Sequence, residues 1–172
     1  MACPINLSMA LDCKDNVGGV KTLYLAVYPS NGLSYSPTIA SGVITAWSSA
    51  SSKFFTYEVR QGIATGNGKA TISKENGTTV YAPAFTTQIE GITAAKSVEL
   101  DNVIKNRLLV IVRLQDDTYW LMGYKNGMDI TEMDVVPGTS MADFKGYKLS
   151  GIGSEPYNWY QVSSGIVAAL LA

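Results

Sequence analysis

The sequence predicts a mainly β fold, a β-sandwich or barrel with one packed α-helix. Short runs rich in β-branched and aromatic residues alternate with Gly, Pro, Asn and Asp turn signals, at intervals typical of sandwiches and barrels. Only one stretch combines an N-cap, a C-terminal cation and an apolar stripe. The chain has 172 residues and 47% hydrophobic residues, which suits a single domain with its own core and excludes intrinsic disorder.

The first sixty residues contain three predicted strands. Residues 20–28 follow the Gly18-Gly19 breaker, residues 43–47 form a short strand, and residues 54–60 alternate with a period of two. In the last run, the more apolar face carries Phe55, Tyr57 and Val59. Pro and Asn-Gly turn signals predict a loop over residues 29–40, and we expect residues 29–52 to form an inserted segment.

A long hairpin follows, because Asn76-Gly77 separates two alternating runs, residues 67–74 and 78–89. One face of the second arm is apolar and carries Tyr81, Phe85 and Ile89. The other face is small or polar and carries Ala82, Ala84, Thr86 and Gln88, with Lys69, Thr71 and Ser73 opposite Ala70 and Ile72 on the first arm.

The second half opens with the predicted helix over residues 93–106, which has Thr93 as N-cap. Its apolar stripe consists of Leu100, Val103 and Ile104, with Ala94 and Val98 beside it. The run 108–114 is apolar on both faces and is expected to be a fully buried strand. Further strands are predicted at 118–124 and 146–152, with 128–131 extending the sheet and 136–144 as a loop. These make about eight strands and one helix.

The residue inventory argues against an enzyme and against a cofactor. There is no His, so the commonest general base and metal ligand are both missing, and no catalytic site is predicted. Cys3 and Cys13 cannot complete a zinc site by themselves, and we expect both to be reduced. Asp129, Glu132 and Asp134 are the densest acidic cluster, but they lack the EF-hand pattern and are interpreted as a solvated loop; no metal site is predicted.

The charge pattern points toward assembly. A net charge of -1 argues against a protein that binds nucleic acid by neutralising phosphates. Only 16% of residues are charged, and a sparsely charged, near-neutral surface tends to associate. The start of the chain shows no signal peptide, and the longest apolar run, 165–172, is too short to span a membrane. We therefore expect a protein made in the cytoplasm.

A late aromatic cluster, Tyr157, Trp159 and Tyr160, has three open interpretations. The rings can cover the edge of the core. They can form a subunit contact, because Tyr and Trp are enriched in interfaces. They can also form a platform that binds carbohydrate.

Three stretches carry a resemblance to a known family. Residues 15–26 (DNVGGVKTLYLA) resemble the start of small virion proteins from tailed phages of Bacteroidetes-type hosts. Residues 108–131 (LLVIVRLQDDTYWLMGYKNGMDIT) resemble their late hairpin, and residues 138–156 resemble their closing Gly-Thr-x-x-x-Asp-x-x-Gly-Tyr-x-Leu pattern. The chain is similar to phage tail tube proteins over about half its length.

The resemblance implies a structural virion protein of the tail. Tail tube subunits form rings, commonly hexameric, and the rings stack into a hollow tube. The resemblance therefore implies contacts with other copies and with other tail proteins, and passage of phage DNA through the tube without specific binding. Strands from every subunit would close one inner β-barrel. The lumen-facing residues would then be the polar set of the hairpin and of residues 54–60, namely Thr56, Glu58, Lys69, Thr71, Ser73, Ala82, Ala84, Thr86 and Gln88.

Contacts between subunits are expected from the inserted segment and from extended termini, residues 1–16 and 156–172. The candidate interface residues are Ser30, Asn31, Tyr35, Trp47, Tyr157, Trp159 and Tyr160. Two alternatives stay open: another virion component, such as a capsid decoration or connector protein, and a β-sandwich module that binds carbohydrate or a host surface.

Overall fold

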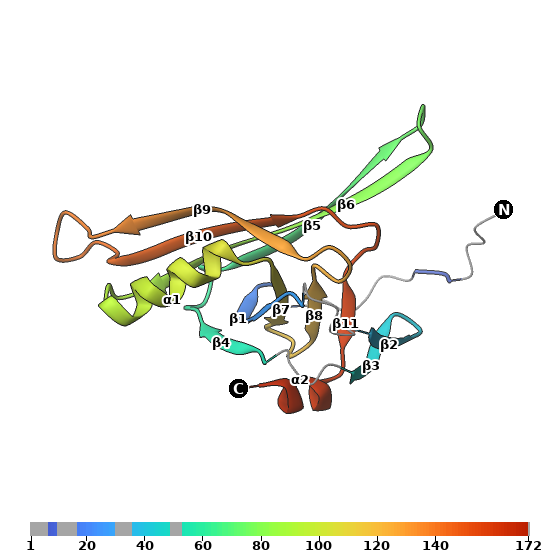
Figure 1. The fold of residues 1–172 in the computed structure, drawn as a ribbon, viewed down its shortest axis with the longest axis horizontal. Helices are drawn as coiled ribbons and strands as arrows, with labels where there is room; N and C mark the ends of the chain where they lie inside the picture. Colours follow the sequence, from blue (N-terminus) through green and yellow to red (C-terminus); the bar gives the residue numbers. More distant parts are fainter. Residues whose placement is uncertain (1–6, 10–16, 30–35, 49–52, 172) are drawn as a thin grey trace.

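The computed structural model describes residues 7–9, 17–29, 36–48 and 53–171 (Figure 1). The fold is mainly β, as predicted, with 53% strand in one large mixed sheet and two short helices. The strands are β1 (Val20–Val27), β2 (Ser36–Ala40), β3 (Val43–Ser48), β4 (Phe55–Glu58), β5 (Thr65–Ser73), β6 (Thr78–Glu90), β7 (Leu108–Leu114), β8 (Tyr119–Met122), β9 (Met128–Val136), β10 (Gly146–Gly153) and β11 (Tyr160–Val162). The helices are α1 (Ala94–Lys105) and α2 (Ser164–Leu170).

Most strands follow one path of hydrogen-bonded neighbours, β2-β3-β11-β8-β7-β9-β10-β6-β5. Off this path, β1 pairs with β7 and with β4. All pairs are antiparallel except β3 with β11. The path ends at β2 and at β5, so the sheet of this chain is not closed, and the barrel alternative of the prediction is wrong for the described residues.

The central strand β7 is buried on both faces, as its apolar run predicts. Val110 and Val112 belong to a first cluster of buried side chains, whereas Leu109 and Ile111 belong to a second cluster on the other face. The apolar run from Leu108 to Val112 therefore contributes side chains to two cores at once.

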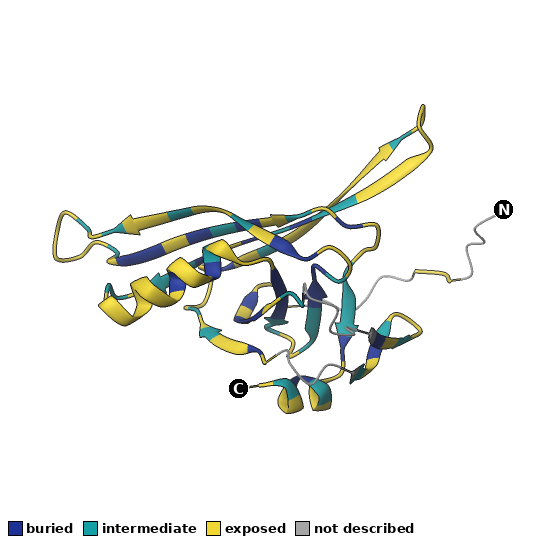
Figure 2. Ribbon diagram, viewed as in Figure 1, coloured by how far each residue is buried: buried dark blue, intermediate teal, exposed yellow. Residues whose placement is uncertain are grey.

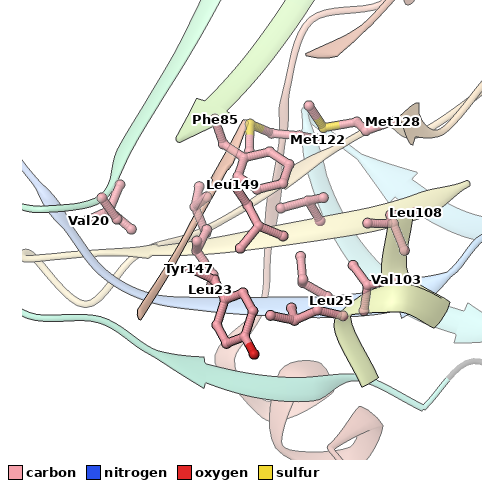
Figure 3. Close-up of a cluster of buried hydrophobic side chains, with 14 residues drawn as sticks. Val20, Leu23, Leu25, Phe85, Val103, Leu108, Met122, Met128, Tyr147 and Leu149 are labelled. Carbon is pink, nitrogen blue, oxygen red and sulfur yellow. The ribbon is translucent and has the colours of Figure 1, made fainter. Parts of the chain in front are cut away.

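The first cluster lies between β1 and β7 on one side and β6, β10 and α1 on the other (Figure 3). Phe85 of β6, and Tyr147 and Leu149 of β10, are each at most 2% exposed. Burying a side chain of this size stabilises a fold by about 1.5–3 kcal/mol. These contacts fix the position of the long strands β6 and β10 relative to the centre of the molecule.

Helix α1 begins and ends close to its predicted bounds. The Thr93 hydroxyl accepts a hydrogen bond from the backbone N–H of Lys96 at 3.3 Å, which confirms the N-cap. Leu100 and Val103 are buried in the first cluster, as the stripe predicts, but Val98 is exposed. The helix thus contributes a narrow apolar face and leaves most of its surface to solvent.

The structure contains three elements that the sequence does not predict. β2 lies within the predicted loop 29–40, β11 is a three-residue strand in the C-terminal tail, and α2 occupies the late apolar run. β2 and β11 are formed by their pairing, β2 on β3 and β11 between β3 and β8, and short strands of this kind have little local signal. The expectation of one helix is therefore wrong; the described residues contain two.

Two strands differ from the expectation in extent or face. β9 runs to Val136 rather than to residue 131. Its acidic residues have weak strand propensity, but pairing with β10 keeps them in the strand. In the run 54–60, Phe54 is buried in the second cluster whereas Phe55 is 53% exposed. The predicted apolar face is therefore only partly covered by the rest of the chain.

Candidate functional site

Four strands form an antiparallel ribbon in the order β9-β10-β6-β5, here called the ribbon. It lies across the rest of the molecule, and the β5–β6 hairpin projects beyond the body (Figure 1). Figure 2 shows that the projecting part of this hairpin is exposed. The Glu75-Asn76-Gly77 turn is confirmed, with Gly77 at φ 62°.

The register of the ribbon separates two faces. Phe85 pairs with Gly66 on one side and with Gly151 on the other, and its ring is buried in the first cluster. Thr86, the next residue, is exposed, and its hydroxyl lies 2.7 Å from the hydroxyl of its partner Thr65. Because side chains alternate along a strand, the face with Phe85 points to the core and the face with Thr86 points away from it.

The face that points away from the core is called the outer face. It carries Asp129, Glu132 and Asp134 of β9, Lys148, Ser150 and Ile152 of β10, Val80, Ala82, Ala84, Thr86 and Gln88 of β6, and Thr65, Asn67, Lys69, Thr71 and Ser73 of β5. Most of these side chains are small or polar. The structure thus brings together the hairpin residues that the sequence groups as one polar set.

Two residues of the predicted set lie elsewhere. Thr56 and Glu58 are on β4, which pairs with β1 and not with any strand of the ribbon. The sequence could not indicate this, because an alternating run does not specify its partner strand. By contrast, the acidic cluster and Lys148 belong to the outer face. Their place there is set by the pairing of β9 with β10 and of β10 with β6, which the sequence does not indicate.

The outer face has mixed charge. Acidic side chains come from β9, and Lys148 and Lys69 come from β10 and β5. A shallow groove of about 160 Å³ lies among Gln88, Glu132, Lys148 and their neighbours. Within the described residues, no group of three His, Cys, Asp or Glu side chains could hold a metal ion.

Both long edges of the ribbon are open. In the described part of the chain, β5 pairs only with β6, and β9 beyond Met128 pairs only with β10. Each edge therefore presents a row of backbone N–H and C=O groups without a partner strand, which is the arrangement through which sheets extend to a further chain.

Trp159, a predicted interface residue, packs on its own ribbon at the root of the hairpin. A Cβ built on Gly68 would lie 3.0 Å from Trp159 Nε1, and one built on Gly66 would lie 3.4 Å from Cη2. The two glycines therefore let the indole lie directly against β5. Its Nε1–H is buried and has no hydrogen-bond partner among the described residues.

The two tyrosines of the aromatic cluster point elsewhere. Tyr157 and Tyr160 pack around Tyr124, with ring centroids 6.1 and 5.1 Å away and steep angles between the rings. Burial is the main cause that raises the pKa of Tyr160, and Tyr124 and Tyr157 contribute. These rings cover one another rather than forming a flat open platform, so the arrangement favours the core-edge interpretation over carbohydrate binding.

The remaining candidate interface residues divide in two. Trp47 makes an edge-to-face contact with Phe54 at 5.6 Å, beside the second cluster. Ser30, Asn31 and Tyr35 lie outside the described residues.

A buried carboxylate holds the ribbon to the body. Glu155 is 3% exposed, and its two oxygens accept hydrogen bonds from the backbone N–H groups of Lys125 and Asn126, at 2.9 and 2.8 Å. Its own backbone pairs with Tyr81 of β6. Burial raises the pKa of Glu155, although these hydrogen bonds oppose the shift. One residue thus ties the turn before β9 to the root of the hairpin.

The closing motif of residues 138–149 is structural. Gly138 has φ 78°, and the Asp143 carboxylate accepts hydrogen bonds from the N–H groups of Thr139 and Ser140, at 2.9 and 2.7 Å, and from the Thr139 hydroxyl. These hydrogen bonds hold the pKa of Asp143 well below its usual range, and the bond from the Thr139 hydroxyl contributes most. The motif shapes the turn between β9 and β10.

Comparisons with protein-family models, with curated proteins and with solved structures found no match. No helix in the described ranges is long and apolar enough to cross a membrane.

Proposed function

We propose that this protein is a structural subunit of a phage tail tube, which assembles through the edges of the ribbon into rings that stack around a channel for DNA. The observation that carries the proposal is a four-stranded antiparallel ribbon with a polar outer face and two open edges. The sequence resemblance over residues 15–26, 108–131 and 138–156 supports the same reading.

Ring closure follows from the strand directions. The ribbon has an even number of antiparallel strands, so β5 and β9 run in opposite directions. When β5 of one copy meets β9 of the next, the pairing stays antiparallel around the ring. A closed ring leaves no open edge, which removes the hazard that open strands otherwise create.

The polar outer face suits the inside of such a ring. Six copies would give a barrel of about 24 strands, a size that encloses an aqueous channel. With strands about 4.8 Å apart, the backbone diameter is about 37 Å or more, which exceeds the width of a DNA duplex. Acidic residues on β9 balance Lys69 and Lys148, so the wall has no excess of cations that would hold the phosphates.

Electron microscopy and sedimentation velocity of the full-length protein over a range of concentrations test the proposal. We expect rings or stacked tubes. Only an 18.4 kDa species at every concentration, alone and with the tail-tip proteins that nucleate assembly, would overturn it. Decoration of isolated capsids would favour the capsid alternative, and dispersed monomers that bind polysaccharide would favour the binding module.

A further inference from the structure

A groove of about 810 Å³ lies between β4, the end of β6 and helix α1, outside the outer face of the ribbon. Its apolar lining comes from Phe55 and Tyr57 of β4, from Val59 just after it, and from Ile89 and Leu100 opposite them. A cavity of about 60 Å³ continues along α1 to Val27. Phe55 and Val27 are 53% and 54% exposed, so this apolar surface is open to solvent.

The groove also contains an open strand edge. β4 pairs with β1 over residues 55–58, and in the described ranges it has no strand on its other side. A strand edge beside apolar side chains is what an added β-strand requires: the backbone supplies hydrogen bonds and alternate side chains enter the groove.

Both cations that line the groove have partners, and further carboxylates line it without adding positive charge. Arg60 pairs with the Glu90 carboxylate, with 2.9 Å between Nη2 and Oε2, and the Lys96 ammonium donates to the Glu90 backbone carbonyl. Burial and the charge of Glu99 raise the pKa of Tyr57 to about 12. The groove therefore offers no free cation to an acidic segment and suits an uncharged strand with apolar side chains.

The chain itself contains such a segment. In residues 5–11, Ile5, Leu7, Met9 and Leu11 alternate with Asn6, Ser8 and Ala10, which is a strict period of two without a charge. Leu7 and Met9 are 76% and 92% exposed. Figure 1 shows the stretch 7–9 off the body on the right of the view, whereas β4 and α1 lie on the left.

We propose that residues 5–11 of one copy add as a strand to the open edge of β4 in a neighbouring copy, with the apolar side chains of the segment against Phe55 and Tyr57. Seven residues span about 20 Å as a strand, enough to cover the four residues of β4. The separation of residues 7–9 from the groove in Figure 1 favours a second copy over the chain's own groove. The inference rests on the proposed self-assembly.

Such a contact joins two different surfaces, so it is heterologous and propagates from copy to copy. It leaves both edges of the ribbon available. It therefore adds a second connection between subunits, independent of the β5–β9 pairing.

Cross-linking of the full-length chain tests the contact. In a background with Cys3→Ser and Cys13→Ser, Ser8→Cys is combined with Thr56→Cys and treated with a bis-maleimide, whose reach tolerates differences in register. We expect a ladder of dimers and higher multimers. Ser8→Cys with Thr71→Cys, an exposed threonine on β5, is the matched control and should give no ladder beyond the dimers of Ser8→Cys alone. A cross-link within one chain, or no ladder, would overturn the proposal.

Two substitutions on opposite faces of the segment supply a second measurement. Leu7→Asp should raise the protein concentration needed for assembly at least tenfold, whereas Ser8→Asp should leave it nearly unchanged. Both residues are exposed, so neither change disturbs the folded subunit. If wild-type protein assembles and both variants assemble equally well, this contact is wrong and the tube proposal stands. If wild-type protein does not assemble under any condition, the tube proposal itself fails.

Discussion

The ring of Phe85 lies so close to Gly151, its partner across β6 and β10, that a Cβ built on Gly151 would be 2.5 Å from Phe85 Cε1. The same Cβ would be 3.3 Å from the backbone oxygen of Asp129 on the other neighbour, β9. The ring therefore occupies the space that a side chain at residue 151 would fill. This contact sets which face of the ribbon is turned toward the core.

Gly151→Ala should lower the free energy of unfolding by about 1–3 kcal/mol, because the ring must shift in a close-packed core. Urea denaturation measures the change. Gly165→Ala is the matched control, because none of the described residues lies within 4 Å of a Cβ built there and alanine is favourable in helix α2. Equal effects of the two substitutions would contradict the packing described here.

The two faces of β6 should respond oppositely to the same substitution. Phe85→Lys places an unpaired charge in the first cluster and removes a buried ring, so we expect a loss of at least about 4 kcal/mol or failure to fold. Thr86→Lys changes an exposed position and should cost less than about 1 kcal/mol. Thermal unfolding of the two variants compares them, and equal tolerance would overturn the register.

The outer face makes a prediction about DNA passage. If it lines the channel, Thr86→Lys should permit tubes but slow DNA release, because each subunit adds a cation beside the phosphates. Thr86→Ser is the control and should release DNA at the wild-type rate. The rate of DNA release from phage particles that carry each variant is the measurement, and an unchanged rate with Thr86→Lys would argue against this lining.

Glu155→Ala should destabilise the fold by about 2–5 kcal/mol, because the backbone N–H groups of Lys125 and Asn126 lose two hydrogen bonds to a charged acceptor. Glu155→Gln keeps one acceptor oxygen and should lose less. Glu75→Ala, at the exposed hairpin turn, is the control and should have almost no effect. Urea midpoints rank the three variants, and a stability of Glu155→Ala equal to wild type would contradict the role assigned to this carboxylate.

The turn held by Asp143 should open in acid. Its pKa is lowered in the folded protein from a usual value of 3.8, so its contribution is complete above that value and is lost as the pH falls below it. The protection factors of the Thr139 and Ser140 amides, which are the observed exchange rates corrected for the intrinsic rate at each pH, should therefore fall at low pH. Asp143→Asn cannot ionise and should remove this pH dependence; a wild-type profile without an acid-induced change would contradict the prediction.

Local patterns predicted the elements whose signal lies within their own residues. Thr93 and the stripe through Leu100 specify α1, Asn76-Gly77 specifies the hairpin, and the unbroken apolar run from Leu108 specifies β7. In each case composition and spacing are enough, because the cap, the turn and the burial on both faces are set within a few residues.

Long-range pairing decides the rest. Nothing around Thr56 indicates that β4 pairs with β1, and nothing in residues 160–162 indicates a strand between β3 and β8. Alternation alone places Ala82, Ala84, Thr86 and Gln88 on one face of β6, whereas the acidic residues of β9 join that face only through their register with β10. The order of strands in a sheet leaves no pattern within the strands themselves, so it cannot be predicted from local residues of a single sequence.

The position of β11 has a consequence for synthesis of the chain. β3 is attached to the rest of the sheet through β11, which is contributed by residues 160–162 near the C-terminal end. β2 and β3 leave the ribosome early, yet their neighbour is made more than a hundred residues later, several seconds afterwards at about 5–20 residues per second. The β2–β3 hairpin therefore docks last, so a chain truncated before Tyr160 would keep its central strands but leave this hairpin undocked.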